Sequence, residues 1–199
     1  WVAGELSAPA LLAQTGWEEI WSFPAAFYLP LFEFVRINRL PMLALNVDAR
    51  LTRAIGDQGW DAVPESEREG VGRAAPASSA YRDFLFSVYR EHAHGQGGRD
   101  SRGFRHFVEA QLNWDRAMAE ALAVRLASGQ GDGRPPLVVG VIGSGHLRHG
   151  HGVPHQLRAL GVGRVVTLLP LAFAEACREM QAGLADALFL LPSKPALPV

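Results

Sequence analysis

The sequence predicts an α/β protein in which a mostly parallel sheet is flanked by helices within a single domain. Apolar, β-rich runs alternate along the chain with stretches of helical periodicity, which is the element order of parallel α/β folds. The run at 137–142 is apolar throughout, as expected of a strand buried on both faces of such a sheet. A length of 199 residues is enough for one domain with a substantial core.

Composition narrows the possible classes of protein. Hydrophobic residues make up 48% of the chain and charged residues 20%, which is typical of an ordinary globular protein. The net charge of -1 and the lack of a basic block argue against a nucleic-acid partner. The single cysteine, Cys177, cannot form an internal disulfide, and its alanine-rich surroundings predict a buried, inert thiol. No apolar run reaches the length of a membrane span.

The two ends of the sequence carry expectations of their own. The chain begins at Trp1, without a methionine and in the middle of a pattern, so we expect it to continue a larger protein whose targeting signal lies outside it. The proline-rich stretch at 192–199 is expected to be a tail that leaves the domain.

The first part of the chain predicts helices followed by one strand. Short helices are expected within 7–23, with Ser7 as the cap of the first. A longer helix is expected over 27–39, and the apolar run at 42–47 predicts a buried strand. Asn46 ends that strand, where a polar group either faces a crevice or satisfies the turn.

The middle of the chain is predicted to be helical. Helices are expected over 49–56, over 80–93 with Ser78 or Ser79 as the cap, and over 101–126. Gln111 and Asp115 lie one turn apart within the apolar stripe of the 101–126 helix, and Glu109 lies off it. Buried polar groups need partners, so Gln111 and Asp115 either stabilise the fold or point into a polar site. We favour the polar site.

The last part of the chain completes the predicted sheet. The runs at 164–169 and 187–191 predict strands, which with 42–47 and 137–142 make four. Helices are expected between them, over 153–160 and from residue 172 onward.

A glycine turn and a histidine follow the strand predicted at 137–142. Gly143 and Gly145 break the strand, and His146 comes next, at the carboxyl edge where ligands bind in open α/β sheets. All 7 histidines lie between His92 and His155. We predict a functional role for His146, whereas a solvated loop explains the later histidines equally well, and a core position explains His92.

Four phrases of the sequence resemble one protein family. They are LPMLALNV at 40–47, EAQLNWDRAMA at 109–119, VIGSGHLRHGHGVP at 141–154 and ADALFL at 185–190. They resemble the ChaN family, bacterial haem-binding uptake proteins of the Tiki/erythromycin-esterase-like superfamily. The resemblance runs from about residue 16 to residue 190.

The resemblance implies a fold, a cofactor and a compartment. It implies an α/β fold and a homodimer that holds paired haems with tyrosine as the iron ligand. Some members are envelope lipoproteins, so a cell-envelope or periplasmic location is expected, with membrane attachment only through a lipid anchor outside this chain. The superfamily carries two Gly-x-x-His motifs. His146 matches the later one, and the earlier has no counterpart, so a ChaN-like domain over 1–191 is expected to lack its first strand and first motif.

Two functional hypotheses follow, beside a purely structural or interaction role. The first is haem binding, which needs an apolar slot, an axial ligand and cationic partners for the propionates. The candidate ligands are Tyr28, Tyr81 and Tyr89, and the candidate propionate partners are His92, His94 and Arg148. The alternative is a metal-dependent hydrolase in which His146 binds a divalent metal or acts as an acid–base group. The pocket candidates are Asn46, Glu109, Gln111, Asp115, Gly143, Gly145 and His146.

Overall fold

A computed structural model describes residues 1–21, 23–92, 97–129, 136–173 and 179–192. Cys177 and the 192–199 tail beyond its first residue therefore lie outside the described residues, as does His94. The chain divides into two compact units, residues 1–44 and 45–199, which we call the first and the second unit. Within the described ranges, none of the helices is both long enough and apolar enough to span a membrane.

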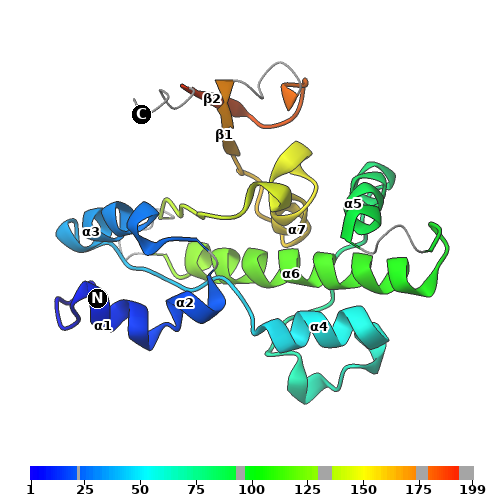
Figure 1. Ribbon diagram of the computed structural model, residues 1–199, viewed down its shortest axis with the longest axis horizontal. Helices are drawn as coiled ribbons and strands as arrows, with labels where there is room; N and C mark the ends of the chain where they lie inside the picture. The colour runs from blue at the N-terminus through cyan, green and yellow to red at the C-terminus, as the bar shows by residue number, and fades with distance from the viewer. Residues whose placement is uncertain (22, 93–96, 130–135, 174–178, 193–199) are drawn as a thin grey trace, which may run out of the picture. The chain divides into compact units, whose positions relative to one another are not determined.

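The first unit is helical, as predicted. Ser7 caps its first helix by accepting a hydrogen bond from the Ala10 amide at 3.3 Å, and the helix ends at Thr15. The elements of the unit are α1 (Ala8–Gln14), α2 (Trp17–Ile20), the 3-10 turn η1 (Ala25–Phe27) and α3 (Leu29–Ile37) (Figure 1).

Aromatic side chains hold the first unit together. The Trp17 ring lies 5.3 Å from Tyr28 and 5.7 Å from Phe32, and Trp21 lies 5.7 Å from Tyr28, measured between ring centroids. The Trp17 indole also donates to the Phe23 carbonyl at 3.0 Å. None of the residues in α1, η1, α2 or α3 is fully buried, so this cluster packs close to the surface of the unit.

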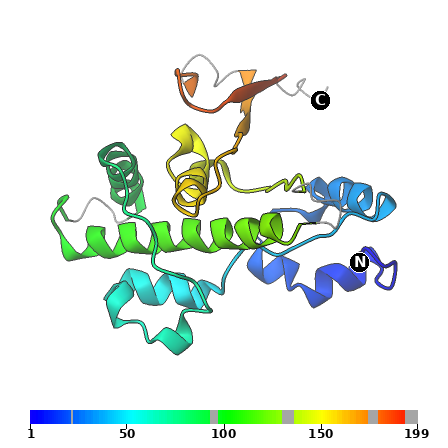
Figure 2. The same cartoon turned by 180° about the vertical axis from the view of Figure 1, so that it is seen from behind.

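The second unit is built around one long helix, α6 (Arg102–Ala127). Helix α4 (Ala49–Gln58), α5 (Ser79–His92) and α7 (Val153–Ala159) each contact it, on different stretches and faces (Figures 1 and 2). Their bounds agree with the predicted helices to within about two residues. Four 3-10 turns join them: η2 (Trp60–Ala62), η3 (Glu65–Glu67), η4 (Ser144–His146) and η5 (Arg148–Gly150).

Three apolar clusters surround α6. Ala110 and Ala117 are small enough for α4 to approach closely, Phe104 and Val108 pack against α5, and Ala119 packs against α7. The buried members are Leu51, Ile55, Trp60, Val63, Val71, Ala110 and Ala117 with α4; Tyr81, Leu85, Phe104, Val108 and Leu112 with α5; and Met118, Ala119, Val153 and Leu157 with α7.

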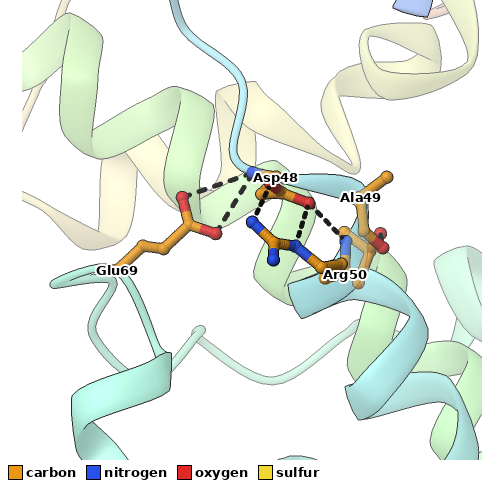
Figure 3. Close-up of polar contacts among 5 residues, drawn as sticks. Asp48, Ala49, Arg50 and Glu69 are labelled. Atoms are coloured by element: carbon orange, nitrogen blue, oxygen red, sulfur yellow. Dashed lines mark hydrogen bonds and ion pairs between the residues drawn. The ribbon is translucent and has the colours of Figure 1, made fainter.

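Asp48, which follows the apolar run at 42–47, caps the start of α4. The Asp48 carboxylate accepts from the Arg50 amide at 2.8 Å and pairs with the Arg50 guanidinium at 2.9 Å (Figure 3). The Asp48 amide in turn donates to the Glu69 carboxylate, at 3.2 and 3.3 Å. The hydrogen bonds from Arg50 lower the pKa of Asp48 to about 2. Asp48 therefore satisfies the turn as a helix cap.

The predicted wide sheet is largely wrong. Within the described residues the sheet has two strands, β1 (Leu168–Ala172) and β2 (Ala187–Leu191), which pair in parallel with Leu168 opposite Ala187. The second strand matches the prediction, whereas the strand predicted at 164–169 begins four residues later. No strand is assigned at 42–47 or 137–142, and neither segment joins the sheet. Apolar composition predicts burial, but a strand also needs a neighbour that accepts its backbone hydrogen bonds.

The 137–142 segment also corrects the expectation of burial on both faces. Ile142 packs in the α7 cluster beside Leu122 of α6. The alternate residues Leu137, Val139 and Val141 are 91%, 75% and 61% exposed. One face of the segment is thus packed and the other is open, because a helix covers only one side of it.

Candidate functional site

The candidate site is centred on the Asp115 carboxylate of α6. Its side chain is fully buried, and both of its oxygens accept a hydrogen bond. The Tyr81 hydroxyl of α5 donates to Oδ2 at 2.7 Å, and Nδ1 of His146 lies 2.6 Å from Oδ1. Residues separated by 31 and 34 positions in the chain therefore meet at one carboxylate.

Burial and hydrogen bonding act in opposite directions on this group. Burial raises the pKa of Asp115, while the hydrogen bonds and charge of His146 and the bond from Tyr81 lower it. Burial and the nearby Asp115 both raise the pKa of the Tyr81 phenol far above its usual value. Tyr81 is thus held as a neutral donor to Asp115 rather than as a phenolate.

The loop after the 137–142 segment positions His146. The His146 amide donates to the Gly143 carbonyl at 3.0 Å and forms the turn η4. A Cβ on Gly145 would meet nothing within 4 Å. A Cβ on Gly152 would lie 2.5 Å from the His146 carbonyl oxygen and 2.7 Å from Asp115 Oδ1. Gly152 is therefore required for the close approach of this loop to Asp115.

Trp114 connects the imidazole to a second predicted pocket residue. The Trp114 ring meets His146 edge-on, with 4.9 Å between centroids. Its indole nitrogen donates to Asn46 Oδ1 at 2.5 Å. Trp114 thus contacts both Asn46 and the imidazole. The amide oxygen of Asn46 also accepts a hydrogen bond from the Val47 backbone at 3.0 Å.

The later histidines extend the network on the Tyr81 side. The His151 ring stacks on Tyr81 at 5.5 Å, and His149 lies 5.4 Å from His151. Burial lowers the pKa of His151, and the charges of His149 and His155 lower it further. His155 itself contacts the Pro76 carbonyl through Nε2 at 3.0 Å.

The pocket candidates separate into two groups. Asn46, Asp115, Gly143, Gly145 and His146 gather around Trp114 and the glycine turn, whereas the Gln111 side chain makes no hydrogen bond with any residue in the described ranges. Glu109 accepts from the Trp60 amide at 2.8 Å and so fixes the turn η2.

Three features of the site were not predicted from the sequence: Tyr81 as a partner of Asp115, Trp114 beside the imidazole, and the close approach at Gly152. Trp114 and Gly152 both lie in the two long phrases of the family resemblance, which was the signal available for them.

The three candidate haem ligands lie in different surroundings. Tyr81 is bonded to Asp115, and Tyr89 is packed between Phe104 and Phe107. Tyr28 is half-buried in the aromatic cluster of the first unit. Of the propionate candidates, Arg148 forms an ion pair with Glu179, and the His92 side chain lies outside what the structure describes.

The described ranges contain no group of three or more His, Cys, Asp or Glu side chains that could hold a metal ion. His146 is thus a single imidazole with one carboxylate partner, rather than part of a multi-ligand cluster within those ranges.

A helical protein with a buried carboxylate–imidazole pair at the end of a glycine turn is the class that the fold and site define. Residues 1–157 match the family model described as "Haem-binding uptake, Tiki superfamily, ChaN", and the chain belongs to this family. The match confirms the family resemblance, and it includes Tyr28, Tyr81, Asp115 and His146. No curated protein and no solved structure matches the chain.

Proposed function

We propose that this chain binds haem in iron uptake, at an interface between two copies, with Tyr28 as the iron ligand. Membership of a haem-binding uptake family supports the cofactor. A location in the bacterial cell envelope, with any lipid anchor outside this chain, belongs to the same proposal.

The choice of Tyr28 rests on the state of the three phenol groups, and this observation carries the proposal. An iron-bound tyrosine is a phenolate, and a phenolate on Tyr81 would lie 2.7 Å from the Asp115 carboxylate. The Tyr89 hydroxyl lies 2.7 Å from where a Cβ of Gly103 would stand, so it packs closely against the backbone of α6. The Tyr28 hydroxyl has no hydrogen-bond partner among the residues described, and its ring packs against Trp17 and Trp21.

The surface of the first unit suits a porphyrin. Large apolar side chains that stay exposed in this unit are Ile20 at 71%, Phe23 at 58%, Phe27 at 69%, Phe34 at 56% and Ile37 at 76%. A haem site is an apolar slot that buries most of its ligand, and an open surface covers only one face of a porphyrin. A second copy of the same surface would cover the other face, which supports the dimer.

Cationic groups for the propionates are available in the same unit. Arg36 lies over the Trp1 ring, with its guanidinium carbon 4.7 Å from the centroid, and Arg39 follows at the end of α3. Of the propionate candidates in the second unit, Arg148 is already paired with Glu179.

Haemin titration of the chain and of two variants tests the proposal. We expect saturable binding with a tyrosinate charge-transfer band, and a shift to dimer in size-exclusion chromatography. Tyr28→Phe is expected to lose that band, whereas Tyr89→Phe, the matched control, is expected to keep it. Wild-type spectra in the Tyr28→Phe complex would overturn the assignment of Tyr28, and an absence of saturable binding would overturn haem binding itself.

A further inference from the structure

Three histidines, which we call the histidine cluster, gather around one loop of the second unit. The loop, residues 148–152, holds His149 and His151, and His155 follows on α7. The ring centroids of His149 and His151 lie 5.4 Å apart, and the half-buried His151 ring stacks on Tyr81 of α5 at 5.5 Å. The His151 ring makes no hydrogen bond within the described ranges, so a second proton on it would find no acceptor there.

The charged groups that face His151 are cations. Charges on His149 and His155 act on it directly, and together with burial they lower its pKa. Arg158 of α7 reaches within 3.5 Å of a backbone carbonyl of the loop. From α5 the loop meets Tyr81, a neutral phenol whose ring face attracts a cation only weakly.

The carboxylates near the loop are engaged elsewhere. Asp115 already accepts two hydrogen bonds, and it is the charge of His155 that lowers its pKa from this side. Glu179 pairs with Arg148, and Asp186 accepts two hydrogen bonds from the residue that precedes β1. Among the described residues, no carboxylate acts on His151 to offset a charge there.

The backbone of the loop is strained in its closed form. His149 has a φ of 54°, in the left-handed region that residues with a Cβ rarely adopt, and Gly150 follows at 64°. The His149 amide donates to the Leu184 carbonyl at 2.8 Å, and Gly152 closes the loop against Asp115. Repulsion between the side chains of such a loop favours an open form, in which the strain is relieved.

We propose that residues 148–152 form an acid-sensitive loop, closed against Asp115 while the histidine cluster is neutral and released when the cluster is protonated. Release separates the His151 ring from Tyr81 and moves Gly152 away from the carboxylate. The proposal goes beyond haem binding and does not depend on it, so the two can fail separately.

The direction of the pH effect follows from proton linkage. A group with a lowered pKa binds its proton more weakly in the closed loop than in an open one. The stability gained from a neutral His151 is complete above the ordinary histidine pKa of 6.5, and it is lost as the pH falls through the lower pKa of the closed loop. Acid therefore favours the open loop.

Hydrogen exchange of the full chain without haem, followed by mass spectrometry and corrected for intrinsic rates, tests the proposal. The amides of His149 and His151 donate to backbone carbonyls in the closed loop. Between about pH 7.5 and about pH 5 we expect their protection to fall by about tenfold or more, because several like charges form close together. Amides in the middle of α4 are the internal control and are expected to stay protected.

Two variants assign the effect to His151. His151→Phe keeps a ring that can stack on Tyr81 and His151→Gln keeps a polar side chain, and neither can be protonated. We expect the acid effect on the loop to shrink in both. His106→Gln is the matched control, because His106 contacts the Asp57 carbonyl from α6 and lies outside the histidine cluster, and it is expected to keep the full effect.

Each outcome decides between distinct conclusions. Unchanged loop protection in acid in the wild type overturns the proposal, as does a parallel loss of protection in α4, which would mean that the whole unit unfolds. A full acid effect in either His151 variant overturns the role of His151. Haem binding is measured separately, so a failed haemin titration leaves this result standing.

Discussion

The two units use their tyrosines in opposite ways. In the first unit, Tyr28 packs against Trp17 and Trp21, and its hydroxyl has no partner within the described ranges. In the second unit, Tyr81 is buried and its hydroxyl is committed to the Asp115 carboxylate. Ring packing alone therefore does not tell whether a tyrosine is structural or available to a ligand, because the partner of the hydroxyl decides it.

The same contrast holds for the two units as a whole. The first unit has no fully buried residue among those that the structure describes, whereas the second buries apolar clusters and a polar network at Asp115. A buried network is costly when one member is lost, since the remaining groups stay buried without partners. The substitutions below test this contrast, from the largest expected effect to the smallest.

Asp115→Ala is expected to have the largest effect on stability. It leaves the Tyr81 hydroxyl and the His146 Nδ1–H without their acceptor, and we expect a loss of about 3–5 kcal/mol in the free energy of unfolding. Urea denaturation followed by circular dichroism measures it. Asp83→Ala is the control, because Asp83 pairs with Arg99 at the surface and exposed pairs contribute about 1 kcal/mol or less. Equal losses in both variants would contradict the assignment of a buried network.

Tyr81→Phe and Tyr28→Phe make the comparison between the units directly. Tyr81→Phe removes a hydrogen bond to a buried carboxylate and is expected to cost about 1.5–3 kcal/mol. Tyr28→Phe removes a hydroxyl with no hydrogen-bond partner in the described ranges and is expected to change stability by less than about 0.5 kcal/mol. The same denaturation experiment applies, and a reversed order would show that the Tyr28 hydroxyl has a structural role.

Gly152→Ala probes the closeness of the His146 loop to α6. The new Cβ would lie 2.5 Å from a backbone oxygen that cannot move freely, so we expect a loss of about 1–3 kcal/mol. Gly145→Ala, in the same loop, meets nothing within 4 Å and is expected to stay within about 0.5 kcal/mol of the wild type. A neutral Gly152→Ala variant would mean that the loop relaxes away from Asp115.

Asp48 extends the comparison to an exposed carboxylate, and the expected effect is the smallest. Its folded pKa of about 2 lies below the ordinary value of 3.8 for an aspartate, so the stability that it contributes is present above about pH 4. That stability is lost as the pH falls through about 2. Asp48→Asn keeps a capping oxygen but not the charge, so thermal midpoints of the variant and the wild type should converge in acid. A difference that persists below pH 2 would contradict this origin.

The helices could be predicted because their signals are local. Ser78 accepts from the Tyr81 amide at 3.1 Å and Ser101 from the Phe104 amide at 3.2 Å, so cap residues fixed the starts of α5 and α6. The sheet could not be predicted in the same way, because β1 and β2 depend on each other across nineteen positions. An apolar run such as 137–142 has the composition of a strand whether or not a neighbour pairs with it.

The site was predicted in part. Asp115 stood out as a charge within an apolar stripe, and His146 as a histidine after a glycine turn, and the structure brings them together. The role of Tyr81 could not be predicted, because its position on the apolar stripe of α5 shows only that its ring is buried. The hydroxyl that reaches Asp115 depends on how α5 and α6 pack.

The central position of α6 also affects how the second unit unfolds and refolds. Since α4, α5 and α7 all pack on this one helix, none of their clusters can form fully before it does. We therefore expect the amide hydrogens near Ala117 and Ala119 to exchange with solvent only when the whole unit unfolds, and those at the two ends of the helix to exchange through local fraying. The second unit is then expected to unfold cooperatively around α6. Asp115, the carboxylate partner of His146, lies in the central part of this helix, which is expected to unfold last.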